Sequence, residues 1–285
     1  MKVIDTHQHL WDLDLLRYSW LKSYPRLNRS FRLSDYRAAA GREMEGTVFV
    51  ECDVDDAYIA DEAQLVLRWA EDPDSRIAGI VAATRPESPG FREYVERLAR
   101  QSKIKGIRRV LHTQLDTLGC QHEFITNVRS LGTYGLSFDL CVLARQLPVA
   151  IDLVSKCLDV TFILDHCGTP SLKERVLDPW RADIRKIAQF PNVSCKVSGL
   201  VAYADPRNWT VEDLRPYVEH VIESFGWDRV MFGSDWPVCT LSASFERWLE
   251  ALESLTRFAG EENRRKLFYD NAVRVYRLHV PEIFP

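Results

Sequence analysis

The sequence lacks the features that define several large classes of protein. Its seven cysteines are an odd and scattered set without a CxxC pair, so neither a disulfide framework nor a structural zinc cluster is expected. Reduced thiols of this kind indicate the cytoplasm. No apolar run approaches the length of a membrane span, and the opening segment MKVIDTHQHLWD does not resemble a secretory signal.

An excess of positive charge is also absent. Lys and Arg number 37 against 41 Asp and Glu, a formal net charge of -4, so neither nucleic acid nor an anionic membrane is an expected partner. The chain has 285 residues, of which 46% are hydrophobic, enough to bury a sizeable core. No linker, repeat or low-complexity segment interrupts it. We therefore expect a single domain over residues 1–285.

Short apolar, β-branched runs alternate with longer helical patterns along the whole chain. Several runs, such as VFVE, TFILD and VMFG, are nearly continuous, which is typical of parallel strands covered on both faces. The eight expected strands are Val3–Thr6, Gly46–Glu51, Arg76–Ala83, Gly106–Leu111, Gly135–Leu140, Thr161–Asp165, Asn192–Val197 and Arg229–Gly233.

Helix start signals lie between these strands. Ser88-Pro89 and Asp178-Pro179 each offer a cap residue followed by a first-turn proline, and Thr210 to Asp213 resembles a capping box without the usual Glu. Two more helices are expected near Phe245–Leu255 and Arg264–Tyr276. Eight strand–helix units predict an α/β fold of the closed (β/α)₈ TIM-barrel type, for which about 250 residues is usual. The stretches 12–33 and 112–123 are expected to be long loops that shape the substrate pocket.

Three polar motifs follow expected strands. His7 and His9 lie two residues apart at the end of the first strand, so both can point toward one metal or one polarised carbonyl. His166 follows the sixth strand in LDHCG, and Asp235 follows the eighth in FGSDWP. Each has an ordinary alternative: structural histidines for the first two motifs, and a turn or helix cap for Asp235.

Taken together, the three motifs favour a catalytic site. The carboxyl ends of barrel strands meet at one mouth, where barrel enzymes place their catalytic groups. His7, His9, His166 and Asp235 are therefore the candidate catalytic residues and the candidate metal ligands. Asp235 can act as a metal ligand, as a general base on water, or as both.

At this point the sequence resembles a known family. HxH, DHxG and FGSDWP resemble the amidohydrolase superfamily, and GIRR, QLP, LDHCGTP, CKVSGL and MFGSDWPVC resemble its sugar-lactonase branch. That branch includes fuconolactonase-like, rhamnonolactonase-like and 2-pyrone-4,6-dicarboxylate hydrolase-like enzymes. The resemblance extends from Asp5 to about Tyr276. It implies an amidohydrolase-type barrel that hydrolyses a sugar lactone, such as L-fucono- or L-rhamnono-lactone, in carbohydrate catabolism.

The resemblance also implies roles. His7, His9 and His166 would polarise the lactone carbonyl, directly or through one divalent ion, and Asp235 would activate water. The fifth strand carries no His and no Lys, which leaves the second metal site of two-metal relatives incomplete. We expect one metal at most, with zinc the expected ion. Metal-free catalysis, which some relatives in this branch use, stays open. The oligomeric state is also open, and a homodimer is compatible with the sequence.

Further residues are candidates for contact with the sugar lactone, the expected small-molecule partner. Strand alternation sends one of Arg108 and Arg109 inward, and the match with the family favours Arg108 as the donor to substrate oxygens, an external salt bridge being the alternative. The other candidates are Asp139 for hydroxyl groups, Trp11 and Trp236 as an apolar wall, and Glu51 as a carboxylate. The role of Lys196 stays undecided, and His220 is expected to be solvated.

Two other functions stay in view. Amidohydrolase relatives with a similar set of histidines and an Asp decarboxylate small aromatic or unsaturated acids, and a catalytically silent sugar-binding barrel is a third reading. The CKVSGL segment favours the lactonase. The complete set of four candidate residues argues against a silent barrel.

Overall fold

Eight parallel strands, hydrogen-bonded in chain order, form the centre of the computed structural model, which describes residues 1–41 and 44–280. All residues of seven strands are buried, and β4 has a single half-buried residue, as expected for strands covered on both faces. The strands are β1 (Ile4–Gln8), β2 (Gly46–Val50), β3 (Ile77–Ala83), β4 (Ile104–Val110), β5 (Ser137–Cys141), β6 (Phe162–Leu164), β7 (Val193–Val197) and β8 (Val230–Phe232).

The sheet closes between its first and last strands. The backbone N–H of Asp235 donates to the carbonyl of His7 at 2.9 Å, and the N–H of His9 donates to that of Trp236 at 2.8 Å. Beside these bonds, the carboxylate of Asp5 accepts from the backbone N–H of Ser234 at 2.8 Å and from its hydroxyl at 2.5 Å. The expected closed (β/α)₈ barrel is confirmed.

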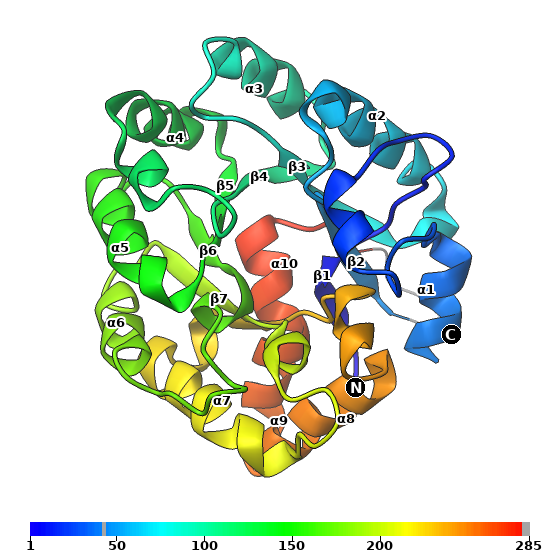
Figure 1. The fold of residues 1–285 in the computed structure, drawn as a ribbon, viewed down its shortest axis with the longest axis vertical. Coiled ribbons are helices and arrows are strands. Elements are labelled where there is room, and N and C mark those ends of the chain that lie inside the picture. Colours follow the sequence, from blue (N-terminus) through cyan, green and yellow to red (C-terminus); the bar gives the residue numbers. More distant parts are fainter. Residues whose placement is uncertain (42–43, 281–285) are drawn as a thin grey trace.

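The helices other than α10 surround the strands as an outer ring (Figure 1). The described helices are α1 (Leu33–Ala40), α2 (Ile59–Trp69), α3 (Phe91–Ala99), α4 (His122–Tyr134), α5 (Leu147–Lys156), α6 (Trp180–Ile187), α7 (Val211–Phe225), α8 (Phe245–Thr256), α9 (Gly260–Arg265) and α10 (Asn271–Tyr276). None of the described helices combines the length and the apolar character needed to cross a bilayer. All seven cysteines are free thiols.

Helix α10 occupies a different place from the others. In the view of Figure 1 it overlaps the middle of the ring of strands, and its Ala272 and Tyr276 belong to a buried cluster together with Ile4, Ile163 and Met231. A second and larger cluster packs the outer helices against the outside of the barrel. The barrel interior is therefore filled by side chains near α10, and the carboxyl ends of the strands are left to form the site.

The expected elements are found with shifted boundaries. β1 runs to Gln8, past the expected end at Thr6, because the backbone at Gln8 still pairs with Phe49 of β2 and with Trp236 on the other side. The expected helix Arg264–Tyr276 is divided into α9, a π-helical turn Lys266–Asp270, and α10. The capping box at the start of α7 is confirmed, with the N–H of Thr210 donating to Asp213 Oδ2 at 2.9 Å.

Three local expectations are wrong. The cap of α3 is Gly90, and the expected cap Ser88 lies earlier, in a turn where its carbonyl accepts the N–H of Phe91. The cap of α6 is Pro179 and not Asp178. His220 is buried against Trp180 and is not solvated. Its Nε2 pairs with the carbonyl of Arg181 at 2.9 Å, because its face of α7 packs on α6.

Candidate active site

His7 and His9 come from the end of β1 and lie side by side. Both are buried, and their Nε2 atoms are 3.1 Å apart. The Nδ1 of His9 lies 2.8 Å from the carbonyl oxygen of Val50. Because a carbonyl only accepts, this Nδ1 carries the proton, which leaves a lone pair on Nε2. The HxH pair thus brings two imidazole nitrogens to one point.

His166 reaches the same point from the turn that follows β6. Its backbone is in the left-handed region, with φ of 53°, a conformation that side-chain-bearing residues adopt uncommonly and often at functional sites. Its Nδ1 lies 2.9 Å from Ser198 Oγ, which orients the ring. Gly199 packs so closely on this ring that an added Cβ would stand 2.4 Å from Nδ1.

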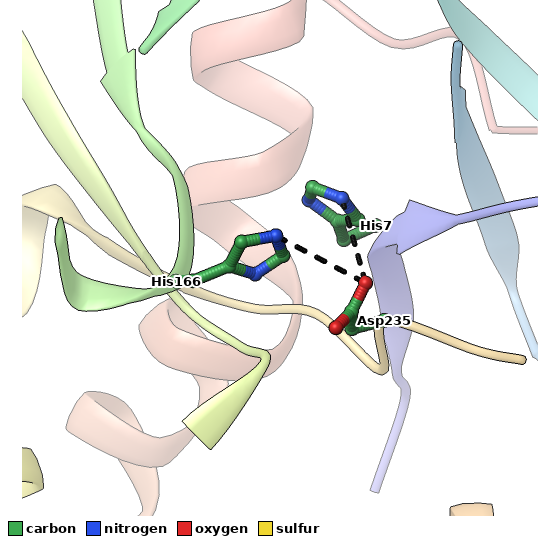
Figure 2. A group of neighbouring side chains, drawn as sticks. All are labelled: His7, His166 and Asp235. Atoms are coloured by element: carbon green, nitrogen blue, oxygen red, sulfur yellow. Dashed lines mark ion pairs between the residues drawn. The ribbon is translucent and has the colours of Figure 1, made fainter. Parts of the chain in front are cut away.

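Asp235 faces all three histidines from the turn after β8. Its Oδ1 lies 3.4 Å from Nε2 of His9, 3.8 Å from that of His7 and 4.0 Å from that of His166. Figure 2 shows His7 and His166 converging on this one oxygen. Burial raises the pKa of Asp235 to about 6. The carboxylate is therefore ionised at neutral pH and is a stronger base than an exposed Asp.

Burial has the opposite effect on the histidines. It lowers the pKa of His9 to about 3 and holds the pKa of His7 and of His166 below the ordinary value. The three imidazoles are therefore neutral at pH 7, each with one nitrogen lone pair, as metal ligation requires.

The donor set fits a metal ion. One ligand atom each from His7, His166 and Asp235 lie within 4.8 Å of one another, and all three residues are buried. Nitrogen and carboxylate oxygen are ligands that zinc prefers, and catalytic zinc sites use about three protein ligands with an open position. His9 lies beside this group through its contact with His7. The residues can hold a single divalent ion.

Arg108 points inward, as expected, and Arg109 pairs with Glu87 at 2.8 Å. The guanidinium of Arg108 is largely engaged. Its Nε donates to Glu51 Oε1 at 2.6 Å, and its Nη1 donates to Asp165 Oδ2 at 3.2 Å. It still borders the site, and its remaining N–H can face a substrate oxygen.

A cavity of about 310 Å³ opens over these groups. Loop 12–33 contributes Trp20, Tyr24 and Leu27 to its wall, and loop 112–123 contributes His112 and Thr113. The remaining lining residues are His9, Trp11, Cys52, Asp53, Arg108, Val110, Cys141, His166, Ala202, Tyr203, Asp235, Val238 and Leu241. Both loops therefore shape the opening above the candidate catalytic groups.

Not every candidate lies at this cavity. Trp11 lines it, but Trp236 does not, because its buried ring packs edge-on against Phe31 and Tyr36. Glu51 is buried behind Arg108, where it also accepts the backbone N–H of Asp53 at 2.7 Å. The structure thus places Glu51 and Trp236 behind the cavity wall.

Asp139 and Lys196 lie deeper in the barrel, paired with each other at 2.6 Å and away from the cavity lining. Lys196 is fully buried, and its Nζ is also 3.0 Å from Asp165 Oδ1 and 3.3 Å from His7 Nδ1. Asp139 is therefore not placed to meet sugar hydroxyls. The residue left undecided by the sequence, Lys196, contacts a candidate catalytic group from below.

Several cavity residues were missed by the sequence reasoning. Asp53 lies on the wall with φ of 50°, and burial raises its pKa to about 6. His112 lies 3.2 Å from Cys141 Sγ on the same wall. Asp165 could have been found from its place directly before His166 at the end of a strand. No local pattern distinguishes Asp53 from other loop carboxylates.

Comparison with known proteins identifies the family of the chain. A family model described as Amidohydrolase matches residues 4–278. The chain is 31% identical to an L-fucono-1,5-lactonase of Burkholderia multivorans, over 98% of this chain and 97% of that one. It is 24% identical to an L-rhamnono-gamma-lactonase of Scheffersomyces stipitis, over 97% and 99%. A crystal structure of a Burkholderia multivorans amidohydrolase with bound Zn superposes with a TM-score of 0.87 at 30% identity, over 98% and 100% of the two chains.

Proposed function

This chain belongs to the amidohydrolase family, and from that premise we propose that it hydrolyses a sugar aldonolactone to the free sugar acid. It is a hydrolase acting on ester bonds. L-Fucono- and L-rhamnono-lactone are the first substrates to consider, because relatives over nearly the whole chain carry those names. The proposed setting is carbohydrate catabolism. The observation that carries the proposal is the convergence of Asp235 with His7, His9 and His166 beside one cavity.

The cavity suits a single sugar ring. Its volume of about 310 Å³ lies at the small end of the range for ligand sites, which begins at about 300 Å³. Trp11 and Trp20 give it an apolar wall on which the ring face can pack. Asp53 and His112, on the same lining, offer polar atoms to the hydroxyl groups. Apolar surface with a few polar groups is the usual composition of a small-molecule site.

Asp235 supplies the base. Its carboxylate takes a proton from water as the water oxygen bonds to the carbonyl carbon of the lactone. The ring C–O bond then breaks, and the proton held by Asp235 passes to the departing ring oxygen, which becomes a hydroxyl group. Each turnover consumes one water and leaves Asp235 ionised. A pKa of about 6 suits both transfers near neutral pH.

The carbonyl of the lactone must carry a developing negative charge as water attacks, and His7, His9 and His166 polarise it directly or through one divalent ion. His9, whose N–H donates to Val50, offers only the lone pair of Nε2 and so acts through the ion. The burial of the three histidines excludes water from the reacting atoms and strengthens each electrostatic contact. A divalent ion held by His7, His166 and Asp235, for which zinc is the expected metal, would supply Lewis-acid polarisation of the same carbonyl. Arg108 keeps its guanidinium at the edge of this site and can donate to a substrate oxygen.

A pH-indicator screen tests the proposal. Sugar lactones and pyrone lactones are added to the protein with and without chelator, and Asp235→Asn serves as the matched inactive control. Release of acid by the unmodified protein, and not by the variant, is the expected result. Release of carbon dioxide from an aromatic acid would identify a decarboxylase. Binding of a sugar lactone without acid release would identify a silent barrel and overturn the proposal.

A further inference from the structure

The fully buried Lys196 lies directly beneath the candidate catalytic residues. Its Nζ is 2.6 Å from Asp139 Oδ2, 3.0 Å from Asp165 Oδ1 and 3.3 Å from His7 Nδ1. An ammonium group has three N–H donors and no acceptor. The mechanism above assigns no step to this cation, although it contacts a candidate catalytic residue.

The direction of the hydrogen bonds in the site can be worked out from one carbonyl. His9 Nδ1 donates to Val50, so His9 Nε2 has a lone pair and must accept. The atom that faces it at 3.1 Å is His7 Nε2, which is the donor in one of the two possible orders. A neutral imidazole carries a single N–H, so His7 Nδ1 then accepts, and Lys196 is the donor that faces it.

Arg108 favours the opposite order. Its Nη1 carries two N–H groups, of which one donates to Asp165 Oδ2 at 3.2 Å and the other faces His7 Nε2 at 3.3 Å, where that nitrogen would accept. Lys196 at Nδ1 and Arg108 at Nε2 are thus two donors that face the two nitrogens of one ring. With Lys196 as the donor, the bonds run from Lys196 to His7, from His7 to His9, and from His9 to Val50.

The opposite tautomer of His7 also has a partner ready. If Nε2 ligates a metal, it must offer a lone pair, and the proton has to be on Nδ1. Asp165 Oδ1 lies 3.4 Å from that nitrogen. Although it is paired electrostatically with Lys196, this oxygen is a buried atom without a hydrogen bond of ordinary geometry among the described residues. It can accept a hydrogen bond from Nδ1–H of His7.

We propose that Lys196 is a positioning residue that, in competition with Asp165 and Arg108, sets which nitrogen of His7 carries the proton. Lys196 donates to Nδ1 and keeps the proton on Nε2 when the site is free of metal. Asp165 accepts a hydrogen bond from Nδ1–H when Nε2 is a ligand. Nε2 loses a proton and Nδ1 gains one, so the ring stays neutral throughout. The inference rests on the proposed function only in treating His7 as part of the catalytic site.

The position of Lys196 is itself fixed from two other elements. Asp139 in β5 accepts from Lys196 and also from the hydroxyl of Tyr276 in α10, at 3.0 Å. The ammonium lies 5.6 Å from the centre of the Tyr276 ring. Held on this side, Lys196 can keep its contact with Asp139 while its other two N–H groups face Asp165 and His7. The last helix thus supports the tautomer of a residue in the first strand.

The test is the ring-nitrogen NMR spectrum of protein labelled with ¹⁵N-histidine, with the His7 signals assigned from a His7→Asn spectrum. The metal-free protein should show His7 protonated at Nε2, and protein loaded with zinc ion should show it protonated at Nδ1. Lys196→Met should move the metal-free signal to the Nδ1-protonated form. It should also lower kcat about 10–100-fold with little change in KM, the scale usual for a residue that orients a catalytic histidine.

Lys103→Met is the matched control. Lys103 is a half-buried lysine whose Nζ donates to the carbonyl of Ile77 at 2.8 Å. It precedes the amino end of β4, at the opposite end of the barrel from the site, so its removal should leave the His7 spectrum unchanged. Lys196→Met leaves the buried carboxylates of Asp139 and Asp165 without their cation, which can prevent folding. The double variant Lys196→Met with Asp139→Asn removes one of those two charges and serves as a second test. Lys196→Arg should restore the wild-type tautomer.

An unchanged His7 tautomer in folded Lys196→Met, with or without Asp139→Asn, would overturn the inference, whatever the activity. The NMR readout needs no substrate. A protein that shows the expected tautomers but turns over no lactone would therefore refute the proposed function and leave the role of Lys196 standing.

Discussion

Replacing Gly199 by alanine should damage the site through a single methyl group. Gly199 has φ of 66° and ψ of -15°, and a Cβ at this position would stand 2.4 Å from His166 Nδ1 and 2.6 Å from its Cγ. Cβ atoms essentially never approach another heavy atom closer than 3.0 Å, so the imidazole has to move by about 0.6 Å or more. That movement takes the ring away from its contact with Ser198 and alters its approach to Asp235.

The expected loss follows from this displacement. A misplacement of about 1 Å in a catalytic constellation can cost roughly 10²-fold in rate, which corresponds to about 2.7 kcal/mol of transition-state stabilisation. We therefore expect kcat/KM to fall about 10²-fold. Alanine in the left-handed conformation also destabilises the fold, by roughly 1–2 kcal/mol, so loss of stability has to be separated from loss of geometry.

Gly41→Ala makes that separation. Gly41 has nearly the same dihedral angles, φ of 65° and ψ of -8°, and nothing lies within 4 Å of its added Cβ. Both variants should lower Tm by a similar amount, about 2–4 °C for each kcal/mol lost. Initial rates on an accepted lactone, measured with a pH indicator beside thermal melts, should show the large loss in Gly199→Ala alone. Equal activity of the two variants would refute the reasoning.

The remaining predictions concern the base, the metal and the guanidinium. Asp235→Asn should lower turnover about 10²–10⁴-fold with little change in Tm, and near wild-type rates would assign the base elsewhere. Since only the carboxylate accepts a proton and burial raises the pKa of Asp235 to about 6, kcat/KM should decline below about pH 6, and residual activity of the variant should lack that decline. Elemental analysis should find at most one tightly bound ion per chain, and two would contradict the ligand set. Arg108→Met should lower kcat/KM about 10²-fold, the effect of losing a charged hydrogen bond worth about 1.5–3 kcal/mol, whereas Arg109→Met, which breaks only the pair with Glu87, should not.

The fold could be predicted because its signal is local and repeated. Eight apolar runs separated by helical patterns lead to a barrel without knowledge of any long-range contact. Boundaries were less predictable, since they depend on tertiary partners. The end of β1 is an example, because Gln8 belongs to the strand through backbone pairing with Phe49 and Trp236, residues far from it in the sequence.

Local sequence was less informative about how deep each side chain lies in the barrel and toward which side it points. The motifs brought His7, His166 and Asp235 together, because the carboxyl ends of barrel strands share one mouth. Trp236 follows Asp235 directly, yet its ring packs behind the cavity wall, and Asp139 lies below the site beside Lys196. Adjacency in sequence does not determine on which side of a turn a ring is buried. Nor does strand alternation give the height of a side chain within a barrel.

The hydrogen bonds between Asp5 and Ser234 have a consequence for the order of events during folding. These residues are 229 positions apart, so this contact must wait until the chain between them is available. Contacts of such long range form slowly, because the chain loses the entropy of loop closure before the contact contributes any stabilisation. An emerging chain that has already formed the strands bearing His7 and His166 still lacks Asp235. Recovery of activity during refolding should therefore coincide with closure of the last strand on the first, later than the gain of helical signal.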